Sequence, residues 1–336
     1  MVVDSIQLDH GSGGRATHEL IRELFAEALS NPFLAEMNDS ALLPALSTPF
    51  AMTTDCYVVD PIIFPGGDIG SLAVHGTVND LAMRGARPLY LSAGFVLEEG
   101  LPLAILSQIV DSMAKAAQNA GVMVVAGDTK VVPRGKVDKL FITTAGVGSV
   151  PPDRLLGGQY AKPGDAVLIN GTMGDHGMAI LCKREGLAFE NEIRSDAASL
   201  HTLVETMLAA CPDIRVLRDP TRGGVATTLN EIAQQSTVGV LLDEGALPIR
   251  QDVAGACEIL GLDPLYVANE GKLLACVPAS SVGMVLAAMQ AHPLGRQACR
   301  IGDIVAGEPG RVVVRTRIGG HRLLTMLRGE QLPRIC

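Results

Sequence analysis

A stretch rich in proline and glycine, residues 151–165, divides this chain into two parts. It begins with Pro151-Pro152 and ends in Lys162-Pro163-Gly164-Asp165, a composition typical of a linker. The chain has 336 residues, more than the roughly 250 to 300 at which a single hydrophobic core stops growing. We therefore expect two domains that share a cleft, at residues 1–150 and 151–328, followed by a flexible tail at 329–336.

Apolar residues recur with helical spacing in some segments of both parts and form short, bounded runs in others. This alternation predicts an α/β fold with mixed sheets. We expect helices at residues 17–29, 70–84, 102–120, 195–210, 225–234, 251–260 and 280–291, and one starting near 178. We expect strands at residues 89–96, 122–126, 140–147, 166–170, 239–243, 273–277, 300–305, 311–316 and 321–325.

Charge and cysteine usage exclude several classes of protein. The net charge of −9 and the pI near 5.3 argue against a surface that binds nucleic acid or an anionic membrane. Seven cysteines are scattered without a C-x-x-C pair, which indicates a reducing compartment and argues against a zinc site or a disulfide framework. The start of the chain lacks a signal-peptide pattern, and no apolar run reaches the length of about 20 residues that spans a bilayer. We expect a cytoplasmic protein.

Two partial motifs near the start of the chain point to other classes of enzyme. Gly11-x-Gly13-x-x-Ala16 matches a dinucleotide fingerprint, but the chain lacks the surrounding βαβ pattern. His18-Glu19 begins an H-E-x-x-H pattern, but its fifth position is Arg22. A glycine loop before a helix can also offer N–H groups to phosphate, or it can be a simple turn. The chain has no G-x-x-x-x-G-K-[ST] motif, so an ATP site here is not a P-loop.

Four aspartates stand in separate polar segments of the first part. Asp39 and Asp55 lie at expected turns, Asp80 lies within the expected helix at 70–84, and Asp128 follows the strand at 122–126. A single aspartate is more often a cap or turn residue. Four of them, beside Gly127-Asp128-Thr129-Lys130, fit a Mg²⁺ site that is completed by substrate phosphates.

The second part carries polar residues in two of its loops. Asp219 and Arg222 precede the helix at 225–234, and Asn269-Glu270-Gly271-Lys272 precedes a strand. Asp219 and Arg222 fit a nucleotide site, or else a helix cap. The final residue, Cys336, offers a thiolate nucleophile on a chain end that can reach a remote site.

Six segments together resemble the HypE family of hydrogenase maturation proteins, the carbamoyl dehydratase branch of the aminoimidazole ribonucleotide synthetase (PurM-like) superfamily. The resemblance spans nearly the whole chain, and its most specific part is the ending Pro-Arg-Ile-Cys336. The segments are His10-Gly-Ser-Gly-Gly14, Val78-Asn-Asp-Leu-Ala-Met-Arg-Gly-Ala-x-Pro88, Gly127-Asp-Thr-Lys130, Arg218-Asp-Pro-Thr-Arg-Gly-Gly224, Asn269-Glu-Gly271 and Pro-Arg-Ile-Cys336.

The resemblance implies a chemistry and a set of partners. A carbamoyltransferase, HypF, places a carbamoyl group on the sulfur of Cys336, and this chain uses ATP and Mg²⁺ to dehydrate it to a thiocyanate. The cyanide then passes to iron in a complex of HypC and HypD, for the [NiFe]-hydrogenase active site. The implied fold pairs the first-domain sheets of two chains into a barrel in a homodimer, with ATP near that interface and an α/β second domain closing the cleft.

These expectations assign a role to each candidate residue. Cys336 carries the group, Glu270 is the general base, and Lys130 stabilises charge on the carbamoyl or phosphoryl oxygen unless it forms a plain ion pair. The expected metal-binding residues are Asp39, Asp55, Asp80 and Asp128. The expected ATP-binding residues are Gly11, Ser12, Gly13, Gly14, Asn79, Thr129, Asp219 and Arg222.

Two other classes of function stay open, and a third is disfavoured. A small-molecule kinase or synthetase on the same scaffold would keep the acidic motifs and would not need Cys336. A dinucleotide-dependent oxidoreductase would depend on the glycines at 11–14. A non-enzymatic scaffold leaves the clustered carboxylates unexplained.

Overall fold

Two large sheets and one two-stranded sheet form the framework of the computed structural model, which describes residues 4–38, 40–187, 189, 192–327, 329 and 334–336. The first sheet has the order β1-β6-β4-β5, in which β4 and β5 are parallel and the other neighbours are antiparallel. Its strands are β1 (Phe50–Tyr57), β4 (Arg87–Glu98), β5 (Met123–Val132) and β6 (Leu140–Ser149). A two-stranded sheet joins β2 (Ile63–Phe64) and β3 (Gly67–Asp68).

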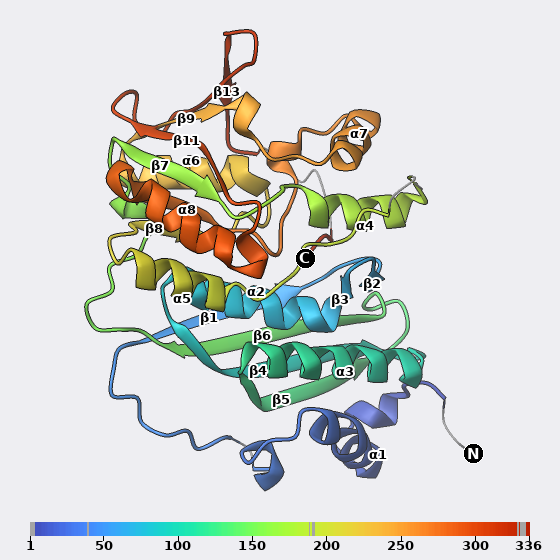
Figure 1. The fold of residues 1–336 in the computed structure, drawn as a ribbon. Helices are drawn as coiled ribbons and strands as arrows, with labels where there is room; N and C mark the ends of the chain where they lie inside the picture. The colour runs from blue at the N-terminus through green and yellow to red at the C-terminus, as the bar shows by residue number, and fades with distance from the viewer. Residues whose placement is uncertain (1–3, 39, 188, 190–191, 328, 330–333) are drawn as a thin grey trace.

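Helices α2 (Ile69–Met83) and α3 (Leu103–Ala120) cover one face of the first sheet (Figure 1). Asp68 caps α2 by accepting hydrogen bonds from the N–H groups of Gly70 and Ser71, which satisfies two donors that a helix start leaves free. Twelve of the fifteen residues of α2 are buried, because the helix lies between the first sheet and the second half of the molecule (Figure 1).

The second sheet takes the order β13-β12-β9-β11-β7-β10-β8. Helices α5 (His201–Ala210) and α8 (Val282–Ala291) lie between this sheet and α2 (Figure 1). The other strands and helices are β7 (Asp165–Ile169), β8 (Val216–Arg218), β9 (Gly239–Asp243), β10 (Leu274–Pro278), β11 (Cys299–Val305), β12 (Val312–Arg315), β13 (His321–Leu324), α4 (Asp175–Glu185), α6 (Gly224–Ser236) and α7 (Gln251–Leu260).

This architecture confirms the predicted α/β fold with mixed sheets, although several expected elements differ in extent. The predicted helix at 17–29 begins at α1 (Arg15–Leu20) and continues as a wider turn through Ile21–Ala26. Its N-cap is Gly14, whereas the hydroxyl of Thr17 accepts the N–H of Gly13. No helix that could cross a membrane was found in the part of the chain that the structure describes.

Two local predictions were wrong because tertiary contacts decide the structure there. Asp55 was expected at a turn but lies within β1, where the apolar Phe50 and Met52 are exposed and the polar Thr53 and Asp55 are partly buried on the side of α2. This pattern reverses the usual alternation of a half-buried strand. The strand that was expected to stop at 126 continues to Val132, so Asp128 and Lys130 lie inside β5.

The predicted helix at 195–210 begins only at His201. The segment before it has no regular structure, because its main chain bonds to other parts of the fold. The N–H of Ser195 donates to Pro65 O at 2.8 Å, and that of Leu200 donates to Asn79 Oδ1 at 2.7 Å. This crossing segment, 195–200, joins the two halves of the molecule.

Candidate active site

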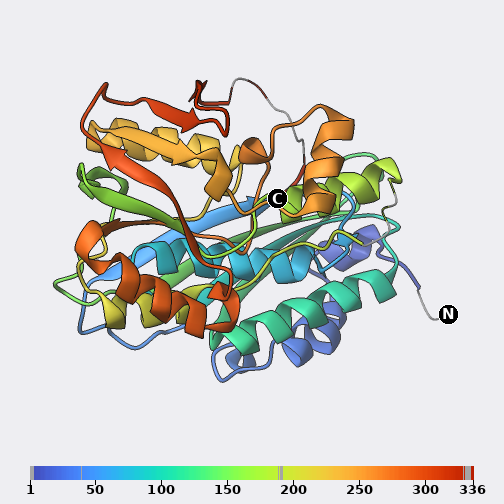
Figure 2. The same ribbon diagram turned by 45° about the horizontal axis from the view of Figure 1, so that its top comes forward.

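The end of the chain lies between the two halves of the molecule, beside α4 (Figures 1 and 2). Residues 58–60, which follow β1, hold its main chain. The N–H of Val58 donates to the carbonyl oxygen of Cys336, and the N–H of Asp60 donates to that of Arg334, both at 3.1 Å. The side chain of Ile335 is buried in the core of the first sheet, at 3% exposure. The end of the tail is therefore held more firmly here than the sequence predicted.

The thiol of Cys336 is half-buried and lies beside Glu270. Burial raises the pKa of this thiol well above its usual value, the carboxylates of Glu270 and Asp55 raise it further, and Arg222 opposes them. The thiol is therefore protonated in this position at neutral pH, and a protonated thiol is a poor nucleophile. This position suits a cysteine that already carries a group better than one that is about to accept it.

Glu270 belongs to an acidic pocket built from separate elements, together with Asp55 on β1, Asp80 on α2 and Asp219 after β8. Glu270 is 3% exposed, and burial raises its pKa well above the usual range, with further contributions from neighbouring carboxylates, Asp219 first. Burial likewise raises the pKa of Asp80 to about 6 and that of Asp219 to about 7. Carboxylates that repel one another in this way favour a cation.

A buried ion pair fixes the backbone of Glu270. Lys272 Nζ lies 2.8 Å from Asp196 Oδ2 in the crossing segment, with side-chain exposures of 10% and 6%. Asp196 Oδ1 also accepts the N–H of Glu270 at 3.2 Å. Gly271 stands between Glu270 and Lys272 in the sequence, and it lies so close to Asp196 that an added Cβ would be 1.8 Å from Asp196 O. Only glycine fits there, which explains this residue of the motif.

Asn269 ties three loops of the site together. Its Oδ1 accepts the N–H of Gly174 at 2.8 Å, and its Nδ2 donates to Pro220 O at 2.9 Å. The loop that carries Asp219 and the start of α4 are thereby held at fixed positions relative to Glu270.

The side chain of Asn79, which is predicted to bind ATP, makes three hydrogen bonds within the chain. Its Nδ2 donates to Ala198 O at 3.0 Å and to Glu270 O at 3.1 Å, and its Oδ1 accepts from Leu200. The side chain is 1% exposed. The sequence could not reveal the bonds to Ala198 and Leu200, because these residues lie in the crossing segment, part of a stretch that was expected to be helical.

The remaining first-domain candidates lie apart from the acidic pocket within one chain. Asp128, Thr129 and Lys130 are on β5, which is separated from β1 by two strands, a span of about 14 Å at ordinary strand spacing. The predicted glycine loop lies against the same strand, where a Cβ on Gly11 would stand 2.5 Å from Val131 N. Ser12, Gly13 and Gly14 follow in this loop, and the N–H of Gly13 already has Thr17 as its acceptor. These candidates therefore form a second group, on the opposite edge of the sheet.

The predicted residues of the second domain do reach the pocket. Asp219 is partly buried among the acids, and Arg222 is exposed but close enough to affect the pKa of Cys336. Asp39 lies outside the described residues.

The acidic pocket suits Mg²⁺ by its charge rather than as a preformed cage. No three His, Cys, Asp or Glu side chains are arranged as metal ligands among the residues that the structure describes. Mg²⁺ is commonly bound by only one or two carboxylates together with substrate phosphates. Burial and, after it, neighbouring carboxylates raise the pKa values of Asp80 and Asp219, and such an ion would favour their charged forms.

Sequence reasoning missed His176, Asp196 and Lys272. His176 begins α4, and its Nε2 donates to Ile335 O at 2.8 Å. Asp196 could not be found, because its segment was assigned to a helix. Lys272 follows the Asn-Glu-Gly motif directly, and this position could have identified it from the sequence.

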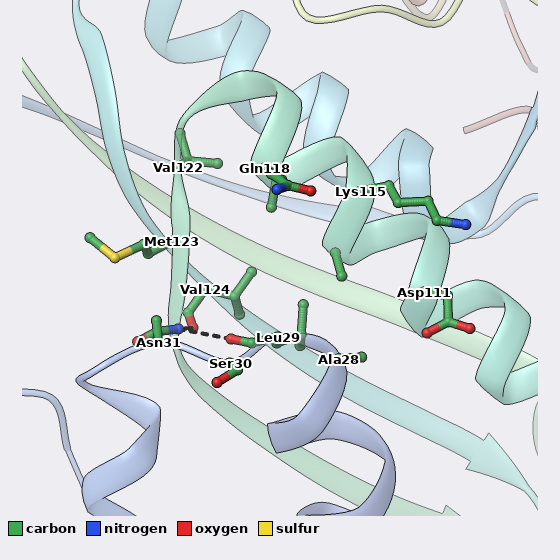
Figure 3. A pocket seen from close by; sticks show the side chains of 12 residues that line it. Ala28, Leu29, Ser30, Asn31, Asp111, Lys115, Gln118, Val122, Met123 and Val124 are labelled. Atoms are coloured by element: carbon green, nitrogen blue, oxygen red, sulfur yellow. Dashed lines mark hydrogen bonds between the residues drawn. The ribbon is translucent and has the colours of Figure 1, made fainter.

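A separate cavity of about 490 Å³ lies between α3 and residues 28–31 (Figure 3). Asn31 spans one side of it and donates from Nδ2 to Val124 O at 2.8 Å. Its described lining includes none of the predicted site residues, so this cavity is not the site of the terminal cysteine.

Comparison with known proteins identifies the family. Residues 37–150 match the N-terminal domain, and residues 162–315 the C-terminal domain, of AIR synthase related protein. Carbamoyl dehydratase HypE of Cupriavidus necator is 60% identical over 98% of this chain and 95% of its own length. The protein of the same name from Escherichia coli is 49% identical over 99% of this chain and 100% of its own length.

Solved structures agree with these relatives. A crystal structure of hydrogenase maturation protein HypE in complex with ATP has a TM-score of 0.95 and 55% identity, covering 98% of this chain and 99% of that one. HypE in a crystal structure of the HypE–HypF complex has a TM-score of 0.81 and 47% identity, covering 92% and 99%. The chain therefore belongs to the AIR synthase related proteins and, among them, to the HypE family of carbamoyl dehydratases.

Proposed function

We propose that this chain uses ATP to dehydrate a carbamoyl group on the sulfur of Cys336 to a thiocyanate. The observation that carries this proposal is the position of the Cys336 thiol, which lies against Glu270 inside the acidic pocket. A kinase for a free small molecule has no need of a cysteine there. The named activity of the relatives and the ATP complex of a HypE structure support the same conclusion.

The chemistry requires an activated oxygen and a base. The carbonyl oxygen of R–S–CO–NH₂ attacks the γ-phosphorus, and ADP leaves. The C–O bond then breaks with release of phosphate as the nitrogen gives up its protons, which leaves R–S–C≡N. We assign the acceptance of a nitrogen proton to Glu270, because a carboxylate whose pKa is raised is a stronger base once it is ionised.

Mg²⁺, when bound, neutralises charge on the phosphates. Asp55, Asp80 and Asp219 are the residues that would hold it. Arg222 would lie beside the transferred group, since it already lies close to the thiol.

We propose a homodimer that completes this site. Phe50 and Met52 on the edge strand β1 are 63% and 67% exposed, an apolar surface that a second sheet would cover. If two copies of the first sheet close into a barrel about a two-fold axis along it, β5 of one chain lies beside β1 of the other. Asp128, Thr129, Lys130 and the glycine loop would then reach the pocket from the partner.

Mixing two inactive variants tests this arrangement. Asp55→Asn and Asp128→Asn should each be inactive alone, and mixed dimers should recover activity, because half of their sites contain both native aspartates. If mixed dimers form and no activity returns, Asp55 of one chain and Asp128 of the other do not complete one site.

The proposed partners and location follow from the same chemistry. HypF would carbamoylate Cys336 while the tail is withdrawn from the pocket, and the HypC–HypD complex would accept the cyanide. All seven cysteines are free thiols in the structure, which fits our proposal that the reaction takes place in the cytoplasm.

Intact-mass measurement of the chain tests the function directly. After incubation with the carbamoylating partner, Cys336 should gain one carbamoyl group, and it should lose one water only when ATP is added. Cys336→Ser should show neither change, and Cys56→Ser should show both. A carbamoylated Cys336 that ATP leaves unchanged contradicts the dehydratase, and ATP turnover with a free substrate in Cys336→Ser favours the kinase.

A further inference from the structure

The last three residues lie in a binding site whose contacts differ from those of the acidic pocket. Each of the three carbonyl groups has a donor. Those of Arg334 and Cys336 accept from the N–H groups of Asp60 and Val58, and that of Ile335 accepts from His176 Nε2 at 2.8 Å. Arg184 also donates to Arg334 O at 2.7 Å. Main-chain bonds of this kind hold a peptide whatever its side chains are.

Side-chain contacts add sequence preference at two positions. The guanidinium of Arg334 pairs with Asp138 and lies 3.3 Å from Asp60 Oδ2. Lys139 and Arg334 beside Asp60 hold the pKa of its carboxyl below its usual range, so this group is charged at neutral pH. Ile335 enters the core. The site therefore favours a basic residue followed by an apolar one.

His176 is locked in one tautomer. A carbonyl oxygen can only accept, so Nε2 carries the proton, and Nδ1 accepts from the hydroxyl of Ser195 at 2.8 Å. The ring is fully buried, and burial lowers its pKa. It is thus a neutral donor in a fixed position, oriented by Ser195 and by an edge-on contact with Phe64 at 5.6 Å.

We propose that Asp60, Asp138 and His176 form a tail-recognition site that selects an arginine two residues before the cysteine and sets the register of the tail. His176 is its positioning residue. A slip of one residue would put another residue in the place of Cys336, and the thiol would then lie away from Glu270. The proposal deepens the proposed function, because it identifies what brings the reacting sulfur to the pocket.

Alkylation of the full chain with iodoacetamide tests recognition without ATP or carbamoyl donor, so its outcome is independent of the dehydratase. Cys336 should react at least about tenfold more slowly than in a free peptide of residues 329–336, because its docked thiol is shielded and protonated. Glu-C digestion and mass spectrometry isolate the C-terminal peptide. Reaction at the rate of the free peptide overturns the proposal.

Asp138→Asn examines the charge contact at an exposed position where folding is not at risk. It should raise the alkylation rate of Cys336 about threefold to fivefold, the range expected for a partly exposed ion pair. Asp303→Asn is the matched control, since it breaks the exposed pair with Arg300 and should leave the rate unchanged. Arg334→Glu should raise the rate, and adding Asp138→Lys should lower it again. Equal rates in Asp138→Asn and the control contradict the selection of arginine.

His176→Phe removes the donor while keeping an aromatic ring. It should raise the alkylation rate by about tenfold or more, because Ile335 O is left without its partner. His176→Gln, which keeps an N–H group near the place of Nε2, should restore much of the protection. Equal rates in the two variants, with circular dichroism spectra like that of the unmodified chain, would show that His176 does not position the tail.

Discussion

Two groups of carboxylates flank the last three residues, and they differ in their counter-charges. Asp60 lies beside Lys139, Arg184 and Arg334, and the pKa of its carboxyl is lowered. Asp80, Asp219 and Glu270 lie mainly among other carboxylates, and their pKa values are raised. The first group is satisfied as it stands and can hold the tail. The second has few positive charges beside it, which fits our proposal that Mg²⁺ and phosphates bind there.

The largest effect should follow from replacing the proposed base. Glu270→Gln should slow dehydration by about 100-fold or more, and should leave the free energy of unfolding equal or higher, because it removes a buried acid from among others. Single-turnover mass measurements and thermal unfolding test both parts. Glu231→Gln is a control, since Glu231 on α6 pairs with Arg218 on β8. Full activity in Glu270→Gln would mean that another group takes the proton.

Lys272→Met tests a buried cation that supports the pocket. It should lower the free energy of unfolding by about 3 to 5 kcal/mol, because Asp196 is left buried without its partner. Denaturant unfolding measures the change. Replacing both residues, Lys272→Met with Asp196→Leu, should recover part of the loss. An unchanged midpoint for Lys272→Met would show that Asp196 finds another donor or water.

The two groups also predict opposite effects of pH on stability. Asp80 and Asp219 have folded-state pKa values of about 6 and about 7, above the unfolded value near 3.9. Between about pH 4 and pH 7 the folded chain therefore binds more protons than the unfolded one, and these groups make stability fall as pH rises, by on the order of 1 kcal/mol per pH unit. Asp60 has the opposite effect, because its folded-state pKa is lowered. Its contribution to stability is present above the unfolded pKa and is lost as the pH falls through the folded pKa.

Thermal unfolding from pH 4.5 to 8 measures this dependence. Asp80→Asn should flatten it, and Mg²⁺ with ATP should stabilise the chain more at pH 8 than at pH 5.5. A dependence that Asp80→Asn leaves unchanged would place the titration elsewhere.

The smallest effect on stability is expected at Asp60, whose carboxylate is already paired. Lys139→Gln breaks a contact of 2.9 Å to Asp60 whose side chains are 44% and 22% exposed. It should change the free energy of unfolding by less than about 1 kcal/mol, and the difference should shrink in high salt. Denaturant unfolding at two salt concentrations measures this. A larger, salt-independent loss would mean that this pair is as critical as the one at Lys272.

The sequence predicted most helices and strands closely, because their apolar spacing is regular and Gly or Pro bounds them. It also identified Cys336, Glu270, Asp55, Asp80 and Asp219, which the structure brings together. It failed at β1, where the apolar side chains are outside, and at the crossing segment, whose main chain bonds to remote residues. The hydrogen bonds of Asn79 to that segment were not predicted for the same reason, and the distance between Asp55 and Asp128 depends on strand order, which local patterns do not encode.

The three hydrogen bonds of Asn79 have a consequence for how the pocket opens. They join α2 of the first half to the crossing segment and to Glu270 of the second half, and the core between α2, α5 and α8 seals the same contact. A hinge between the halves would have to break all of these at once. Withdrawing the last three residues leaves this core intact, so we expect the chain end, rather than a hinge between the halves, to open the pocket.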